Sequence, residues 1–164
     1  MSVTVEVRPA EAAVHWWQCR PVEVMARGAR MGSIILDVRG RRPWLASRQL
    51  GPPAVAALRE LARATGVAIY AYCVMPDHVH LVIGASPRCD LRAFALRFKR
   101  RVERAAWAAG LRERLFEVSF RGHVVRHPAQ LRFVMNEVLE NPVRRGLVRD
   151  WKEYPYAGSF ELEV

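Results

Sequence analysis

Cysteine and acidic residues are scarce in this 164-residue chain, and long apolar runs are missing. The three cysteines are odd in number and form no C-x-x-C pair, which argues against a disulfide framework and a cysteine zinc site. No apolar run approaches the roughly 20 residues that a membrane span needs, and the first residues contain no apolar region typical of a signal peptide. We therefore expect a soluble cytoplasmic protein with no membrane association.

The shortage of acidic residues leaves a strongly basic chain. Its 26 Lys and Arg residues face 16 Asp and Glu residues, a formal net charge of +10. Arginine suits phosphate recognition, and a basic domain attracts polyanions by releasing their counterions, so nucleic acid is the leading partner. A basic face can also serve solubility or bind a membrane surface, so charge alone does not decide between these functions.

With 164 residues, of which 51% are hydrophobic, the chain can fill one core well but is short for two. We find no internal repeat, linker or low-complexity stretch, and residues 1–164 are expected to form a single domain.

Apolar periodicity and turn residues predict the elements of this domain. Helices are expected over residues 10–18, from Pro52 to Gly66, over 90–109, and from His127 to Asn141; strands are expected over 22–28, 33–38, 67–74 and 78–83, with a short extended piece within 113–125. Helices separated by hairpins, without regular strand–helix alternation, indicate an α+β domain with an antiparallel sheet.

The most informative motif is His78-Val79-His80, in the second strand of the hairpin "YCVMPDHVHLVI". Because a strand repeats every two residues, both histidines project from one face, as in a two-nitrogen metal clamp. Asp77, in the turn before them, is a candidate for orienting one imidazole. Taken alone, an H-x-H pair is a modest signal, since two nearby histidines often only form local hydrogen bonds.

The residues around this pair form a longer pattern. "YCVMPDHVHLVI" resembles the signature of the HUH single-tyrosine transposases, in particular the REP-associated tyrosine transposases of bacteria. Four further segments agree in order with that family: "VEVMARG", "LRAFALRFKRR", "FRGHVVR" and "VLENPVRRGLVRDWKEYPYAGSF". The resemblance covers roughly residues 20–160.

The resemblance implies a ferredoxin-like antiparallel sheet with helices packed on it, and a site that binds single-stranded or hairpin DNA. It implies that His78, His80 and Asn141 hold a divalent metal, Mg or Mn, which polarises the scissile phosphate. It also implies that a tyrosine on the last long helix attacks this phosphate and becomes covalently linked to the DNA, so that strands can be cut and rejoined.

The chain departs from the family at this nucleophile. The family's tyrosine lies four residues before the asparagine, and that position is Glu137 here; no tyrosine occurs between Tyr72 and Tyr154. Four interpretations remain open for Glu137: a metal ligand, a general base that makes the enzyme a hydrolytic nickase, a carboxylate nucleophile, or an inert helix residue in a relative that binds DNA without cutting it.

Several basic side chains are candidates for contacts with DNA phosphates. The basic helix is expected to lie beside the phosphate site and contributes five of them, whereas the others come from the remaining family-like segments. These DNA-binding candidates are Arg27, Arg92, Lys99, Arg100, Arg101, Arg104, His123, Arg126, Arg144 and Arg145. Members of the family act as monomers or homodimers, and we expect one of these states here.

Overall fold

The computed structural model describes residues 30–161. Its five strands form one sheet in the order β4-β1-β3-β2-β5, and every pair of neighbours is antiparallel. The strands are β1 (Met31–Asp37), β2 (Ala68–Met75), β3 (His78–Gly84), β4 (Arg121–Val124) and β5 (Ala157–Gly158). The first four, with two intervening helices, form the split β-α-β arrangement of ferredoxin-like folds. The expected α+β ferredoxin-like fold is therefore confirmed.

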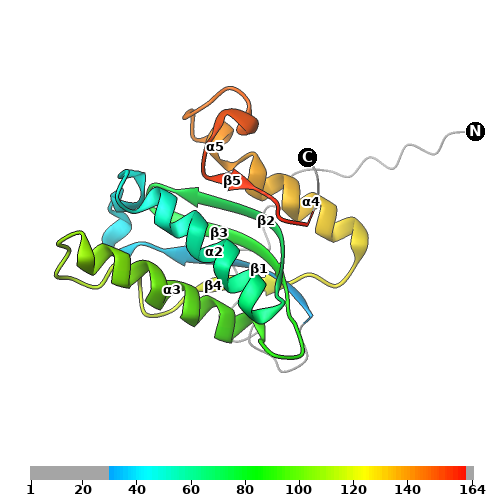
Figure 1. Ribbon diagram of the computed structural model, residues 1–164. Coiled ribbons are helices and arrows are strands. Elements are labelled where there is room, and N and C mark those ends of the chain that lie inside the picture. Colours follow the sequence, from blue (N-terminus) through cyan, green and yellow to red (C-terminus); the bar gives the residue numbers. More distant parts are fainter. Residues whose placement is uncertain (1–29, 162–164) are drawn as a thin grey trace, which may run out of the picture.

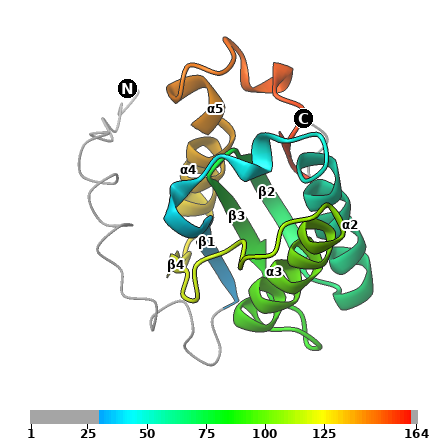
Figure 2. The ribbon, with the colours of Figure 1, turned by 90° about the vertical axis from the view of Figure 1, so that its left-hand side faces the viewer.

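Helices cover both faces of this sheet (Figures 1 and 2). Helices α2 (Gly51–Thr65) and α3 (Leu91–Ala108) pack on one face, and α4 (Pro128–Leu139) packs on the other. The short α5 (Asn141–Arg144) follows α4 after a single residue, and 3₁₀ turns occupy Arg39–Arg41 (η1), Trp44–Ala46 (η2) and Trp151–Glu153 (η3). The sheet thus separates two hydrophobic cores.

Local sequence explains where the helices begin and end. Two prolines occupy the first turn of α2, and Gly66 ends it in the left-handed conformation at φ 74°. The Asp90 carboxylate accepts a hydrogen bond of 2.7 Å from the Ala93 N–H and caps α3. The helix predicted from His127 ends at Leu139, and Asn141 begins α5 with Pro142 in its first turn.

The hairpin of β2 and β3 carries the histidine motif in the middle of the sheet. Val79, Leu81 and Ile83 belong to the core beneath α2 and α3, whereas Val82 belongs to the core beneath α4. This alternation places His78 and His80 on the α4 face, as the two-residue period predicts. The helix expected over residues 10–18 and the strand over 22–28 lie outside the described residues. No helix within residues 30–161 combines the length and apolar character that a bilayer crossing requires.

Candidate DNA-binding and metal site

A pocket of about 450 Å³ opens on the α4 face of the sheet. Its walls come from β1, β3 and β4 on one side and from α4 and α5 on the other. The side chains lining it include both histidines of the motif, five arginines and one carboxylate: Ser33, Ile35, Arg41, His78, His80, Arg121, His123, Val124, Arg126, Gln130, Phe133, Val134, Glu137, Asn141, Arg144 and Arg145. The pocket therefore joins segments that are far apart in the sequence.

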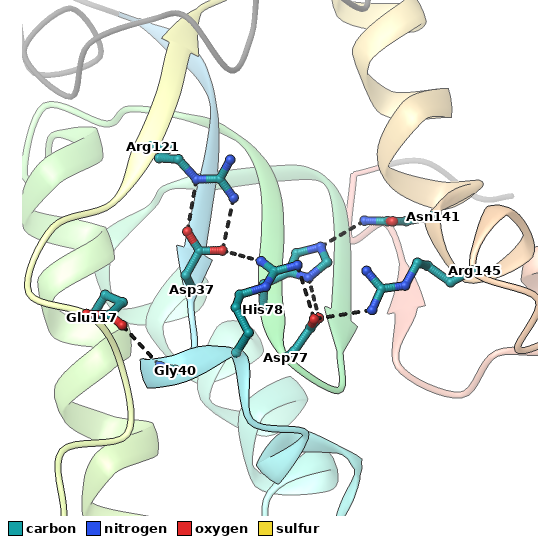
Figure 3. A network of polar contacts seen from close by, with 9 residues as sticks. Asp37, Gly40, Asp77, His78, Glu117, Arg121, Asn141 and Arg145 are labelled. Atoms are coloured by element: carbon teal, nitrogen blue, oxygen red, sulfur yellow. Dashed lines mark hydrogen bonds and ion pairs between the residues drawn. The ribbon is translucent and has the colours of Figure 1, made fainter.

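His78 is held between a carboxylate and an amide (Figure 3). Its Nδ1–H donates to Asp77 Oδ1 at 2.7 Å, and Asn141 Nδ2 donates to His78 Nε2 at 3.1 Å. The carboxylate fixes the tautomer that leaves Nε2 unprotonated. Asp77 thus takes the orienting position that its place in the turn predicts, and Asn141 lies beside His78.

His80 lies deeper in the same pocket, with 7% of its surface exposed. Its Nε2 is 2.9 Å from Ser33 Oγ, a hydroxyl that can donate to an unprotonated ring nitrogen. Burial, reinforced by the charges of His78 and His123, lowers the pKa of His80 to about 3. Burial also lowers the pKa of His78, although the Asp77 carboxylate opposes this effect. Both rings are therefore neutral at pH 7, the state in which imidazole binds metals.

These donors fit the divalent metal that the family resemblance implies. His78 Nε2 and His80 Nε2 lie beside polar neighbours in the same pocket, and the side-chain amide of Asn141, whose nitrogen donates to His78 Nε2, also contains an oxygen of the kind that binds divalent metals. Within residues 30–161, no group of three His, Cys, Asp or Glu side chains is placed to hold a metal. Glu137 lines the same pocket, and its role as a metal ligand stays a prediction.

Two carboxylates organise the arginines at the mouth of the pocket. Asp37 accepts bidentate hydrogen bonds from Arg121, at 2.9 and 3.0 Å, and a further hydrogen bond from Arg41 at 2.5 Å. Asp77 pairs with Arg41 at 3.1 Å and with Arg145 at 3.2 Å. Burial raises the pKa of Asp77, but His78 and the two arginines outweigh this effect and lower it overall. Both carboxylates lie behind the pocket wall, and the guanidinium groups line it.

Glu137 is the only carboxylate among the described residues that line the pocket. It lies on α4, and Arg144 from α5 engages it twice: Nη1 lies 3.2 Å from Oε1, and Nη2 donates to the Glu137 carbonyl at 2.6 Å. Arg144 therefore engages both the side chain and the backbone of Glu137.

No tyrosine lines the pocket, although all four tyrosines of the chain lie within the described residues. Tyr154 donates to the Val74 carbonyl at 2.8 Å, and burial raises the pKa of its hydroxyl. Tyr72 packs on Phe160 with ring centroids 4.8 Å apart. These rings have structural roles, and none replaces the tyrosine missing at position 137.

The structure brings together only some of the predicted DNA contacts. His123, Arg126, Arg144 and Arg145 line the pocket, where burial lowers the pKa of His123. Arg27 lies outside the described residues. The remaining candidates are on α3, which packs on the sheet face opposite α4 (Figure 2). The structure thus places the basic helix across the sheet from the histidine pair rather than beside it.

Lys99 needs a further correction because it is not a surface cation. Only 8% of the residue is exposed, and its ammonium donates to the Glu117 carbonyl at 2.5 Å and to the Val118 carbonyl at 3.1 Å. Lys99 therefore anchors the segment after α3. On the exposed side of the same helix, Arg92, Arg100, Arg101 and Arg104 form a separate basic surface, where Arg101 pairs with Glu60.

Sequence reasoning missed Arg41 and Arg121 as pocket residues. Arg41 belongs to "RGRRP", a Gly- and Pro-containing segment after the predicted strand 33–38, and Arg121 is the first residue of "RGHVV". The sequence offers one signal for these residues, which is Asp37 at the end of β1. A carboxylate there can hold a nearby arginine in place.

Comparisons with known proteins agree with this geometry. The family model described as "Transposase IS200 like" matches residues 32–119. A solved structure of a REP-associated tyrosine transposase bound to a REP hairpin superposes with a TM-score of 0.66 at 22% identity, over 79% of this chain and 76% of that one. A protein described as a transposase of Deinococcus radiodurans R1 gives a TM-score of 0.51 at 24% identity, over 68% and 88% of the two chains. Among curated proteins, no relative matches the chain.

Proposed function

This chain belongs to the IS200-like transposases, and we propose that it binds single-stranded or hairpin DNA in the pocket at His78 and His80 without forming a phosphotyrosine link. One observation carries the proposal. The pocket combines a histidine pair, Asn141 and five arginines with no tyrosine, so it keeps the phosphate-binding groups and lacks the attacking hydroxyl. The hairpin bound to the similar REP-associated transposase supports DNA as the partner.

In this proposal, different side chains of the pocket bind the metal and the DNA phosphates. His78, His80 and Asn141 would hold the divalent metal, Mg or Mn, and Asp77 keeps the His78 ring in the tautomer that leaves Nε2 unprotonated. When bound, the metal withdraws charge from a phosphate oxygen as a Lewis acid. The arginines around the pocket neutralise the neighbouring phosphates of the strand, and Phe133 and Ile35 give the pocket an apolar wall against which a nucleotide can lie.

A hydrolytic nickase is the second candidate, because Glu137 is a carboxylate that lines the same pocket as the histidines. A glutamate is a competent general base for activating water. The ion pair with Arg144 opposes this role, since the Glu137 carboxylate oxygen Oε1 is already engaged by the Arg144 guanidinium. DNA binding without cleavage is therefore the better-supported function.

One experiment separates the two candidates and also tests for covalent chemistry. The protein is incubated with a labelled single-stranded hairpin and Mg or Mn, and the products are separated under denaturing conditions. We expect salt-sensitive binding, no nicked strand and no adduct. Nicking without an adduct that disappears in Glu137→Gln would establish the hydrolase instead. A denaturant-resistant adduct would refute the loss of covalent chemistry, and the absence of salt-sensitive binding would refute the DNA-binding function itself.

A further inference from the structure

We propose that Arg41 contacts a DNA phosphate next to the histidine pair, and that Asp37 is a positioning residue which holds Arg41 in place for that contact. This inference rests on the proposed DNA-binding function and deepens it. It assigns the phosphate contact nearest His78 to a residue of the turn after β1, outside the segments where the family resemblance places DNA contacts.

The backbone at Arg41 is unusual and firmly held. Arg41 has a φ of 54° and follows Gly40 at 65°, so a residue with a bulky side chain occupies the left-handed region. For L-residues this conformation costs roughly 1–2 kcal/mol, and surrounding contacts must maintain it. The Gly40 N–H donates to Glu117 Oε1 at 3.1 Å, and the Arg41 N–H donates to the Val38 carbonyl at 2.8 Å. These contacts turn the chain back toward the pocket.

The side chain of Arg41 bridges two carboxylates, Asp37 and Asp77. One nitrogen lies 2.5 Å from Asp37 and another lies 3.1 Å from Asp77, the carboxylate that also accepts from His78. Arg41 and His78 therefore share an anchor. A ligand that reaches His78 Nε2 from the pocket lies within the neighbourhood of the Arg41 guanidinium.

Exposure shows which end of this network faces a ligand. The Arg41 side chain is 45% exposed, whereas Asp37 is 18% exposed and Asp77 is 10% exposed. A guanidinium carries five N–H donors, so its two carboxylate contacts leave donors for a third acceptor. A phosphodiester oxygen is that acceptor in a pocket that binds DNA, because arginine matches phosphate in charge and planar geometry.

The neighbouring Arg42 provides a matched control. It lies in the same turn and carries the same charge, but its guanidinium is 3.5 Å from Glu113 and 5.1 Å from the centre of the Trp44 ring, and it does not line the pocket. Its substitution tests the loss of one positive charge at nearly the same place in the sequence. Because both substitutions remove one positive charge, a difference in DNA affinity between them shows that the position of the Arg41 guanidinium in the pocket matters.

The experiment measures binding of fluorescent single-stranded DNA by anisotropy across a salt series, with a chelator present to exclude metal-mediated contacts. We expect Arg41→Gln to weaken binding about tenfold and to reduce the slope of log affinity against log salt by about 0.7, as loss of one phosphate contact requires. Arg42→Gln should change affinity less than about threefold, because its guanidinium is farther from the bound strand and is screened by salt.

The direction in which Asp37→Asn changes DNA affinity tests the positioning role of Asp37. The substitution removes a negative charge, so electrostatics alone predicts tighter DNA binding, whereas loss of positioning predicts weaker binding. We expect weaker binding in the single variant and a smaller loss when it is combined with Arg41→Gln, because the part that acts through Arg41 is already removed and only the part that acts through Arg121 remains. Circular dichroism confirms that each variant is folded; if Asp37→Asn does not fold, the comparison of Arg41→Gln with Arg42→Gln still decides the assignment of Arg41.

Each part of the inference has its own contradicting result. Equal effects of Arg41→Gln and Arg42→Gln would overturn the phosphate contact. Tighter binding by Asp37→Asn, or an undiminished loss on the Arg41→Gln background, would overturn the positioning role. Either result with normal binding by the unaltered protein would leave the proposed function standing, whereas failure of the unaltered protein to bind DNA would overturn both.

Discussion

Acid should destabilise this protein through the buried His80. In the unfolded chain a histidine has a pKa near 6.5, whereas the folded pocket lowers the pKa of His80 to about 3. Between these values the unfolded state binds a proton that the folded state excludes. The free energy of unfolding therefore carries no penalty from His80 above pH 6.5, where the ring is neutral in both states. It falls as the pH drops from 6.5 toward 3.

The magnitude follows from the two pKa values. Each pH unit below the unfolded pKa costs about 1.4 kcal/mol, so the 1.5 units between pH 6.5 and pH 5.0 correspond to about 2 kcal/mol from His80 alone. This is a large share of the roughly 5–15 kcal/mol that stabilises a typical domain. A shift of this size is well above the error of a denaturation measurement.

The assay is urea denaturation at pH 7.5 and pH 5.0, with a chelator present, for the unaltered protein and for His80→Asn. The loss of unfolding free energy between the two pH values should be about 2 kcal/mol smaller in the variant. His78 and His123 remain in both proteins, so their contributions cancel in this comparison. The same substitution at His127, whose side chain is exposed, serves as the control. An equal acid loss in the unaltered protein and in His80→Asn would refute the reasoning.

Three further predictions concern the pocket and its supports. Asp77→Asn should weaken Mn²⁺ binding about 10- to 100-fold by calorimetry, because the His78 ring loses its orienting carboxylate; unchanged affinity would exclude the histidine site. Glu137→Tyr should yield a denaturant-resistant DNA adduct in gels with Mn²⁺, and a clean lane would show that more than the nucleophile is missing. Lys99→Met should lower the free energy of unfolding by about 1.5–3 kcal/mol in urea, because two carbonyls lose a charged donor, with DNA affinity nearly unchanged.

The fold was largely predictable because its local signals agree with one another. All but the last residue of the strand predicted over 33–38 lie in β1, and Gly66 ends α2 as predicted. The two-residue period of the hairpin correctly placed both histidines on one face. Strand and helix periodicities are properties of short segments, so they can be recognised before any long-range contact is known.

The candidate site was only partly predictable, because its members come from segments that meet through packing. Asp37 pairs with both Arg41 and Arg121 and holds them at the pocket. No periodic pattern in the sequence reveals these pairs. Charge density on the basic helix suggested a phosphate contact, but charge carries no information on which sheet face a helix covers. The apolar stripe of α3 packs beside α2, opposite the histidines, and burial turns Lys99 into a structural donor.

The sequence by itself determined the family, the pair of histidines on one strand face and the absence of a tyrosine at position 137, because these depend only on which residues occur and in what order. Only the tertiary structure decided that Asp77 and Asn141 flank His78, that Arg144 neutralises Glu137, and that no other tyrosine enters the pocket. The reason is physical: hydrogen bonds and ion pairs act over a few ångströms, and only the packing of α4 and α5 against the sheet brings these groups within that range.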